Sequence, residues 1–224
     1  MRFADRHPLT PTPTRGGEVG LRRLMLVTDG AALGEAAGAR RIAAAISGGV
    51  DIVQLRDRSA SPADLLARAQ LLSGLLANTP LIVNDRVDVA MVVGAAGVQL
   101  GTGSLPVAEA RRLLGRQALI GRSVHSVQEA RLAAAEGADY LVVGTIYPTN
   151  THPDQPPEGP PLLEAVSRVI RVPFFAIGGV TAETVGECIK RGAQGVAVIR
   201  AIAGADDPEA AAHELRAAIY QALC

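Results

Sequence analysis

The chain has 224 residues, a length that suits one large domain or two small ones and allows a sizeable hydrophobic core. Hydrophobic residues make up 48% and Trp is absent, so Ala, Val, Leu and Ile carry the apolar content, as is typical of parallel strands buried on both faces. The 22 basic and 22 acidic residues give a formal net charge of +0, which gives no indication of a nucleic-acid or membrane partner.

The start of the chain shows no strand or helix pattern. Residues 1–20 contain three prolines among Thr and Arg residues and no apolar run of the kind that a secretory signal needs. We therefore expect a disordered leader over 1–20 and a single catalytic domain over 21–224. No apolar run approaches the length of a membrane span. The two cysteines, Cys188 and Cys224, show neither a disulfide framework nor metal-ligand spacing, so a reducing cytoplasm is the expected location.

From residue 24 onward, short apolar runs alternate with longer Ala-rich stretches. The predicted strands are Leu24–Thr28, Ile52–Leu55, Leu81–Asn84, Val98–Leu100, Leu119–Ser123, Tyr140–Val143, Phe174–Ile177 and Val196–Ile199. The predicted helices include Pro62–Ala77, Pro106–Leu114, Val127–Glu136 and Thr181–Arg191. Ser61, Ser126 and Thr181 are expected to cap three of these helices at their N-termini.

A glycine turn recurs before every second predicted strand. Gly49, Gly94, Gly137 and Gly192 each follow a helical stretch and precede a strand, where a C-cap glycine is favoured. The pattern therefore repeats once in every βαβα segment, that is, once in every two strand–helix units. Eight alternating units with such a repeat favour a closed (βα)8 TIM barrel, with an open doubly wound sheet as the alternative.

Polar side chains gather at the C-terminal ends of most predicted strands and in the loops just after them. In a barrel, the chemistry takes place at these ends and in the loops that follow them. The residues concerned include Gln54, Arg56, Arg58, Asn84, Asp85, Gln99, Ser104, Ser123, His125 and Arg200. Their position predicts an active site for a small molecule at one end of the barrel.

Gly178 and Gly179 precede a predicted helix after the seventh strand, so their amides could hold a phosphate at a helix N-terminus. Arg200, one strand further on, could add a bidentate contact. The alternative is a tight turn that needs glycine for its backbone, with an exposed arginine nearby. We favour a phosphate site and thus a small phosphorylated substrate.

Two further groups could take part in chemistry. His125 follows the fifth strand, and imidazole is suited to moving a proton near neutral pH, although a capping or packing role is the alternative. Asn84 and Asp85 could hold a divalent cation, but the loop after the fourth strand adds no acid. Asp85 could instead pair with Arg56 or Arg58, so no metal site is predicted from these residues.

The segment from Thr145 to Pro161 is rich in Pro, Thr and Asn and lacks a hydrophobic pattern. A loop of this length in a compact domain is usually functional or mobile. We interpret it as a lid, with Thr149, Thr151 and His152 directed at the substrate. The alternative is a flexible surface insertion.

Five motifs carry a family resemblance. They are Val53-Gln54-Leu55-Arg56-Asp57, Val83-Asn84-Asp85-Arg86, Tyr147-Pro148-Thr149-Asn150-Thr151, Ala176-Ile177-Gly178-Gly179 and Gly195-Val196-Ala197-Val198. Together they resemble the thiamine phosphate synthase and TenI family from about residue 24 to the C-terminus. The resemblance implies a barrel, often dimeric, that binds a thiazole ethyl phosphate, so we expect a homodimer.

The resemblance implies two alternative activities. The synthase joins a pyrimidine methyl diphosphate to the thiazole phosphate with Mg²⁺ and releases pyrophosphate, whereas TenI-type tautomerases aromatise a carboxythiazole phosphate by a proton shift without a metal. Residues that match the synthase pattern are Gln54, Arg56, Asn84, Asp85, Ser123, Thr149, Thr151 and Gly179. Four positions depart from it: Arg58 and His152 each stand where the synthase has Lys, Ser104 replaces an Mg²⁺-binding Asp, and Arg200 replaces a phosphate-loop Ser. These changes weaken the expected handling of magnesium pyrophosphate.

The sequence therefore favours a thiazole tautomerase without a cofactor, in which His125, by resemblance to TenI, moves the proton. The expected substrate contacts are Gln54, Arg56, Asn84, Ser123, Thr149, Thr151 and His152, with Gly178, Gly179 and Arg200 on the phosphate. The first alternative is a synthase in which Asp85 binds Mg²⁺. The second is a non-catalytic regulator that binds the ligand without turnover.

Overall fold

The computed structural model describes residues 12–13, 19–20, 23–28, 36–149 and 156–224. Of the predicted leader, it describes only the short strands β1 (Thr12–Pro13) and β2 (Val19–Gly20), which pair in antiparallel orientation. The rest of residues 1–20 lies outside the described part of the chain, as do Thr151 and His152 of the predicted lid.

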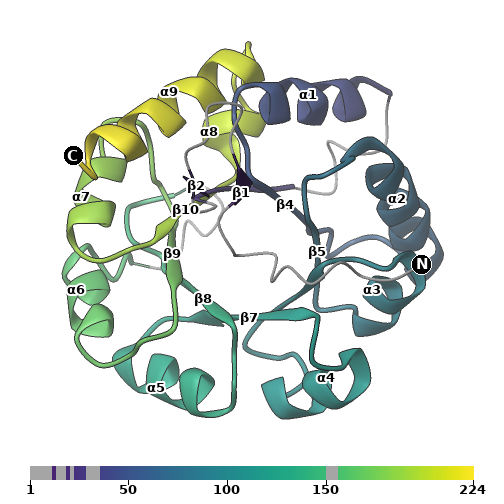
Figure 1. Cartoon of the computed structure of the whole chain (residues 1–224), viewed down its shortest axis with the longest axis horizontal. Helices are drawn as coiled ribbons and strands as arrows, with labels where there is room; N and C mark the ends of the chain where they lie inside the picture. Colours follow the sequence, from purple (N-terminus) through teal and green to yellow (C-terminus); the bar gives the residue numbers. More distant parts are fainter. Residues whose placement is uncertain (1–11, 14–18, 21–22, 29–35, 150–155) are drawn as a thin grey trace.

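The main sheet is a closed parallel barrel in the order β10-β3-β4-β5-β6-β7-β8-β9 (Figure 1). Its strands are β3 (Leu24–Val27), β4 (Ile52–Leu55), β5 (Leu81–Asn84), β6 (Gly97–Leu100), β7 (Leu119–Val124), β8 (Tyr140–Val143), β9 (Phe174–Ile177) and β10 (Gly195–Val198). The predicted TIM barrel is confirmed, and every predicted strand end lies within one residue of the observed one. The open doubly wound sheet is wrong because β10 pairs with β3 and closes the ring.

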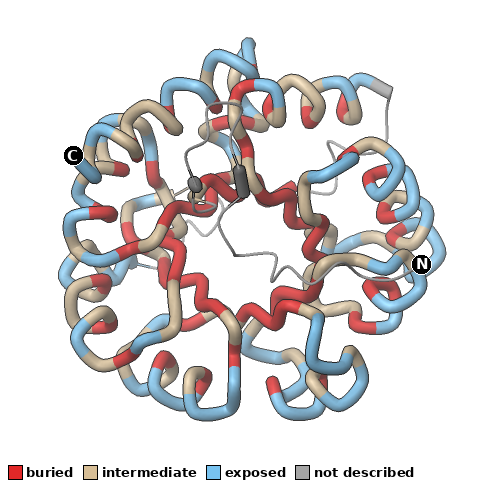
Figure 2. Tube along the Cα trace, viewed as in Figure 1, coloured by how far each residue is buried: buried red, intermediate tan, exposed pale blue. Residues whose placement is uncertain are grey.

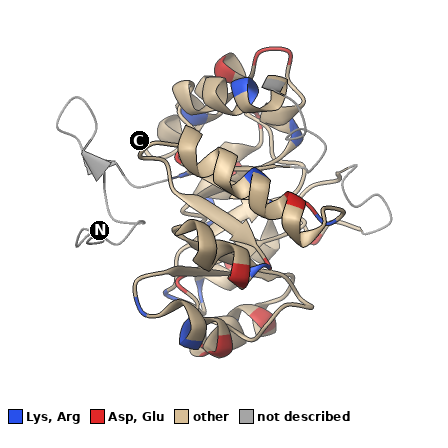
Figure 3. Cartoon of the chain, turned by 90° about the vertical axis from the view of Figure 1, so that its right-hand side faces the viewer, with Lys and Arg blue, Asp and Glu red and all other residues tan. Residues whose placement is uncertain are grey.

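Helices form the outer ring around the barrel (Figure 1). They are α1 (Ala36–Ser47), α2 (Pro62–Leu75), α3 (Val87–Val93), α4 (Val107–Leu114), α5 (Val127–Ala135), α6 (Pro161–Ser167), α7 (Val185–Lys190), α8 (Arg200–Ala203) and α9 (Pro208–Gln221). Figure 3 shows basic positions in blue and acidic positions in red, both present on the helices that face the viewer. None of the helices among the described residues has the length and apolar character needed to cross a bilayer.

Two of the three predicted helix caps are confirmed. The Ser61 hydroxyl accepts a hydrogen bond from the amide of Asp64, and Ser126 does the same for Glu129. The predicted cap at Thr181 is wrong, because α7 begins four residues later, at Val185. A turn intervenes, in which the amide of Thr181 donates to Thr184 Oγ1 over 2.9 Å.

The recurrent glycine turns are present where the sequence predicts them. Gly49 and Gly192 have φ angles of 113° and 100°, in the region that only glycine adopts readily. Gly94 and Gly137 also have positive φ. These residues turn the chain from α1, α3, α5 and α7 into the next strand.

The core has two parts, one between the helices and the sheet and one inside the barrel. Figure 2 shows the barrel strands as a buried ring. The inner cluster consists of Met25, Val27, Ile52, Ile82, Leu119, Tyr140, Val142, Phe175 and Ala197. The rings of Tyr140 and Phe175 meet edge to face, with centroids 5.9 Å apart. Because this cluster fills the barrel interior, a ligand must bind above it, at one end of the strands.

Gly97 on β6 provides a test of the strand packing. A Cβ atom at Gly97 would lie 1.9 Å from the carbonyl oxygen of Leu119 on β7, so Gly97→Ala must push these strands apart. We expect it to lower the free energy of unfolding by about 3 kcal/mol. The control is Gly74→Ala on α2, where nothing lies within 4 Å of the new methyl group. It should raise the free energy of unfolding by about 0.5–1 kcal/mol. Urea unfolding measures both, and wild-type stability in Gly97→Ala would contradict this strand spacing.

Cys188 provides a second test of the core. It is fully buried on α7, whereas Cys224 is exposed. Burial raises the pKa of the Cys188 thiol to about 11, above its ordinary value of 9.0. At pH 8 we expect a thiol reagent such as DTNB to label native protein at Cys224 alone and Cys188 only after unfolding. Because the unfolded chain loses this proton first, the free energy of unfolding should fall as the pH rises above 9.0. Fast labelling of native Cys224→Ser protein would contradict the burial.

Candidate active site

A cavity of about 680 Å³ opens at the C-terminal ends of the barrel strands. Every barrel strand or the loop after it contributes to its wall, as expected for a barrel enzyme. The predicted site residues that line it are Gln54, Arg56, Asn84, Asp85, Ser123, His125, Thr149, Gly178, Gly179 and Arg200. The cavity has the size of a small-molecule site.

One half of the cavity wall is polar. Gln54, Asn84, Gln99 and Ser123 occupy inward-facing positions near the ends of β4, β5, β6 and β7. The Gln54 amide nitrogen donates to Asn84 Oδ1 over 2.9 Å, and that of Gln99 donates to Ser123 Oγ over 3.0 Å. Gln54 and Gln99 are only 3% and 2% exposed. These buried hydrogen bonds hold the polar groups in fixed orientations.

The other half of the wall is apolar. Val142, Ile177, Ala197 and Val27 line it from β8, β9, β10 and β3, the strands that complete the ring. A substrate ring with one polar edge could therefore contact both halves at the same time.

Asp85 lies where β5 leaves the barrel, with a φ angle of 60°. Its carboxylate accepts hydrogen bonds from the side-chain amide of Asn84 (2.6 Å), from the backbone amide of Gly101 (2.9 Å) and from the Ser104 hydroxyl. The fold thus brings Ser104 next to Asp85, although the sequence separates them by 19 positions.

The residues around Asp85 fit a phosphate-bound Mg²⁺ better than a metal held by protein alone. Among the described residues, no group of three or more His, Cys, Asp or Glu side chains is arranged to hold a metal ion. Asp85 could supply one carboxylate ligand, and Mg²⁺ commonly takes its remaining ligands from substrate phosphates and water.

Three arginines line the cavity, against a single described acidic side chain, Asp85. Arg56 and Arg58 follow β4, and Arg200 is the first residue of α8. Between the first two, Asp57 pairs with Arg68. The Asp57 carboxylate also accepts the backbone amides of Ser59 (2.9 Å) and Ala60 (3.1 Å), which shapes this loop. The excess of positive charge favours anionic ligands.

Gly178 and Gly179 follow β9 with φ angles of 98° and 63°. A Cβ atom at Gly178 would lie 2.4 Å from Thr145 Cγ2, and one at Gly179 would lie 2.4 Å from the Pro148 carbonyl oxygen. The close approach of the loop after β8 therefore requires glycine at both positions. The expected helix N-terminus at these residues is wrong, because α7 begins only at Val185. The short helix α8 instead starts at this side of the cavity.

His125 lies at the cavity mouth, just after β7. Its backbone amide donates to the Glu129 carboxylate over 2.7 Å, and its ring Nδ1 contacts the carbonyl oxygen of Gly144. When Nδ1 donates to that carbonyl, Nε2 is left to exchange a proton with a ligand.

Some residues that line the cavity are not among the substrate contacts expected from the sequence. Gln99 belongs to the polar wall, and the alternation of inward positions along β6 was the signal that could have identified it. The Thr28 hydroxyl accepts the amide of Arg56 over 3.0 Å and so helps to place the loop after β4. No local pattern in the sequence indicates that contact.

Comparison with known proteins assigns the family. A family model described as thiamine monophosphate synthase matches residues 24–202. The thiamine-phosphate synthase of Roseiflexus sp. (strain RS-1) is 41% identical over 216 residues, which cover 95% of this chain and 89% of that protein. That of Chloroflexus aurantiacus is 45% identical over 201 residues, covering 88% and 92%. The structure of a thiamine phosphate pyrophosphorylase from Pyrococcus furiosus aligns with a TM-score of 0.82 and 33% identity, over 91% of this chain and 98% of that one. The chain therefore belongs to the thiamine monophosphate synthase family of enzymes.

Proposed function

We propose that the chain is a thiamine phosphate synthase, which joins a pyrimidine methyl diphosphate to a thiazole ethyl phosphate. In this reaction the methylene carbon loses its bond to the diphosphate oxygen and gains a bond to the thiazole nitrogen, and pyrophosphate leaves. From the sequence alone, this activity is the first alternative to the tautomerase. The relatives described above support the synthase instead, because those that are 41% and 45% identical carry its name.

The observation that carries the proposal is the placement, on opposite sides of one cavity, of groups that could bind phosphate directly or through Mg²⁺. Gly178 and Gly179 follow β9, and Asp85 follows β5. In the closed ring these two strands are separated by β10, β3 and β4 on one side and by β6, β7 and β8 on the other. Two phosphorylated substrates, one at each side, would fit this arrangement. A tautomerase with a single phosphorylated substrate needs only one of the two sides.

The thiazole phosphate would bind on the β9 and β10 side. Barrel enzymes commonly bind phosphate in the loops after the seventh and eighth strands and at a short extra helix. The backbone amides of Gly178 and Gly179 and the guanidinium group of Arg200 would contact the phosphate here. Val142 and Ile177, on the apolar wall, would contact the thiazole ring.

The pyrimidine diphosphate would bind on the β4 and β5 side. Gln54 and Asn84 offer hydrogen-bonding groups to the pyrimidine ring, and Arg56 and Arg58 offer positive charge to the diphosphate. Asp85 would hold Mg²⁺ together with diphosphate oxygens. When bound, Mg²⁺ would neutralise charge on the leaving pyrophosphate.

Further parts of the proposal rest on the family resemblance. Ser123 and Thr149, which line the cavity, and Thr151 and His152 of the loop after β8 would contact substrate. We also propose a leader over residues 1–20, a cytoplasmic location and a homodimer, for which size-exclusion chromatography with light scattering is the test.

A thiazole tautomerase remains the second candidate, and the placement of His125 favours it. The ring lies at the cavity mouth with Nδ1 on the Gly144 carbonyl oxygen, so Nε2 could move a proton on a bound thiazole. This activity would need no metal.

A direct assay distinguishes the candidates. Purified chain with both substrates and Mg²⁺ should form thiamine phosphate, detected as fluorescent thiochrome after oxidation, and an equal amount of pyrophosphate. A parallel sample with carboxythiazole phosphate and EDTA, without pyrimidine, is followed by NMR. Aromatisation there that is lost in His125→Ala, without thiamine phosphate in the first sample, would replace the synthase with the tautomerase. If the chain binds thiazole phosphate but catalyses neither the synthase nor the tautomerase reaction, it is the non-catalytic regulator.

Asp85→Asn tests the proposed diphosphate side. The substitution keeps the size of the side chain but removes the single described carboxylate from the cavity wall. We expect kcat/KM of the synthase reaction at fixed Mg²⁺ to fall on the order of 100-fold. The control is Asp88→Asn, since Asp88 pairs with Arg86 on the surface and its side chain is 64% exposed. Equal activity of the Asp85→Asn and Asp88→Asn proteins would rule out Asp85 as a metal ligand.

A further inference from the structure

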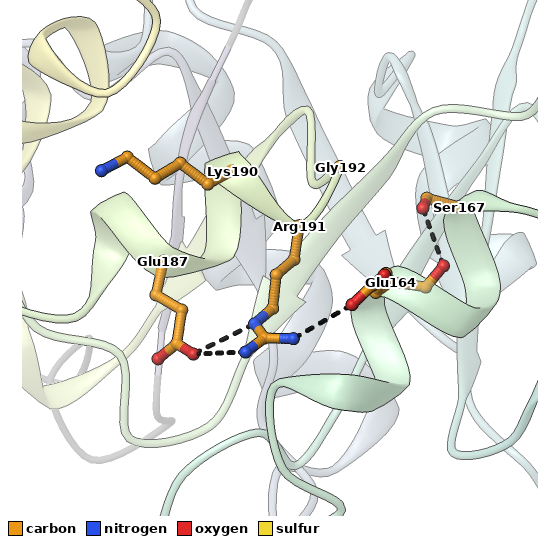
Figure 4. A pocket seen from close by; sticks show the side chains of 6 residues that line it. All are labelled: Glu164, Ser167, Glu187, Lys190, Arg191 and Gly192. Carbon is orange, nitrogen blue, oxygen red and sulfur yellow. Dashed lines mark hydrogen bonds and ion pairs between the residues drawn. The ribbon is translucent and has the colours of Figure 1, made fainter.

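One chain of polar contacts joins the start of the loop between β8 and α6, through α7 and the residue after it, to α6 itself. Near the start of the loop, the Tyr147 hydroxyl donates to Glu187 Oε2 over 2.9 Å. Glu187 Oε1 in turn accepts from Arg191 Nε over 3.0 Å, and the same guanidinium group contacts Glu164 Oε2 on α6 over 3.2 Å (Figure 4). The described part of this loop contributes Gly144, Thr145, Pro148 and Thr149 to the cavity.

Tyr147 connects this chain of contacts to the glycine turn after β9. Its backbone amide donates to the Gly178 carbonyl oxygen over 2.9 Å. A Cβ atom at Gly179 would lie 2.8 Å from Tyr147 Cβ, so the tyrosine backbone packs directly against that glycine. Burial, and then the bond to Glu187, raise the pKa of the Tyr147 hydroxyl, which keeps its proton for donation at neutral pH. The backbone of Tyr147 thus lies directly against the turn formed by Gly178 and Gly179.

Glu187, Arg191 and Glu164 lie outside the active-site cavity. They line a separate cavity of about 590 Å³ between α6 and α7, together with Ser167, Lys190 and Gly192 (Figure 4). The side chains of Glu187 and Arg191 are 45% and 32% exposed, and ion pairs at such sites add little to stability. Removing one of them should therefore leave the fold intact.

We propose that Glu187 is a positioning residue for the phosphate end of the active site. It holds Tyr147 against Gly178 and Gly179, and Arg191 carries the same restraint to α6, where the loop ends. Without Glu187, the Tyr147 side chain loses its anchor and the turn at Gly178 and Gly179 is held less firmly, so the bound phosphate loses well-placed donors. The proposal rests on the proposed function, because it assumes that Gly178 and Gly179 bind the thiazole phosphate.

Three substitutions test the bonds of Glu187 to Tyr147 and to Arg191 one at a time. Glu187→Ala removes the bonds to Tyr147 and Arg191, Tyr147→Phe removes only the first, and Glu187→Gln keeps an oxygen that accepts from Tyr147. We expect Glu187→Ala and Tyr147→Phe each to raise KM for the thiazole phosphate about fivefold, with kcat within about twofold of wild type. Glu187→Gln should keep a KM near wild type, and the Glu187→Ala/Tyr147→Phe double variant should be no worse than Glu187→Ala alone.

Arg168→Gln is the matched control. Arg168 pairs with Glu164 as Arg191 does, but its side chain is 73% exposed, and no described contact joins it directly to Glu187 or Tyr147. Arg168→Gln should leave KM for the thiazole phosphate unchanged. Thermal unfolding of each variant is measured in parallel, and Tyr147→Phe provides the test if Glu187→Ala does not fold. Wild-type KM in Glu187→Ala or Tyr147→Phe, or an equal rise in Arg168→Gln, would overturn the proposal.

Calorimetric titration with thiazole phosphate alone separates this inference from the proposed function. Wild-type protein that binds the phosphate but forms no thiamine phosphate would reject the synthase activity. The inference would still hold if Glu187→Ala binds thiazole phosphate about fivefold more weakly and Arg168→Gln binds it normally. Equal affinities in all variants would overturn the inference whatever the wild-type turnover.

Discussion

The pairing of β10 with β3, which aligns Val196 with Leu24 and Val198 with Leu26, closes the sheet into a barrel. In a closed parallel barrel every second residue points inward, so the strands share one narrow interior. Large side chains such as Tyr140 and Phe175 fill that interior. The remaining inward positions at the C-terminal ends form part of the wall of a cavity, which is where we propose that the substrates bind.

The cavity wall has a polar half and an apolar half, and the order of the strands in the closed ring explains this division. The strands from β4 to β7 are neighbours and carry the polar inward residues, whereas β8, β9, β10 and β3 carry apolar ones. A ring compound can therefore bury one face and still use its polar edge. Cationic groups flank the cavity from the loops after β4 and β10, which suits ligands with more than one phosphate.

Close backbone approach determines the shape of the cavity beside β9. Gly178 and Gly179 leave no room for a side chain, because the loop after β8 lies directly against them. The amide of Ile146 donates to the Ile177 carbonyl oxygen over 2.9 Å, so this loop continues the pairing of β8 with β9 beyond the barrel. The hydrogen bond from the Tyr147 hydroxyl to Glu187 holds the same segment from outside the active-site cavity. Surface groups on α7 are in this way coupled to the active site.

The amino-acid sequence alone predicts the barrel, the approximate strand boundaries and most of the polar residues that line the cavity. Alternating patterns and glycine turns are local signals that locate the strand ends. Because barrel enzymes carry their site residues at the C-terminal strand ends, Gln54, Asn84 and Ser123 follow as candidates. Which of these side chains contact one another depends on the three-dimensional fold. The contact of Ser104 with Asp85, the late start of α7 and the link from Tyr147 to Glu187 join segments far apart in the chain or depend on how a loop packs. Such contacts leave no periodic pattern in the sequence, because they depend on the closed ring rather than on local backbone preference.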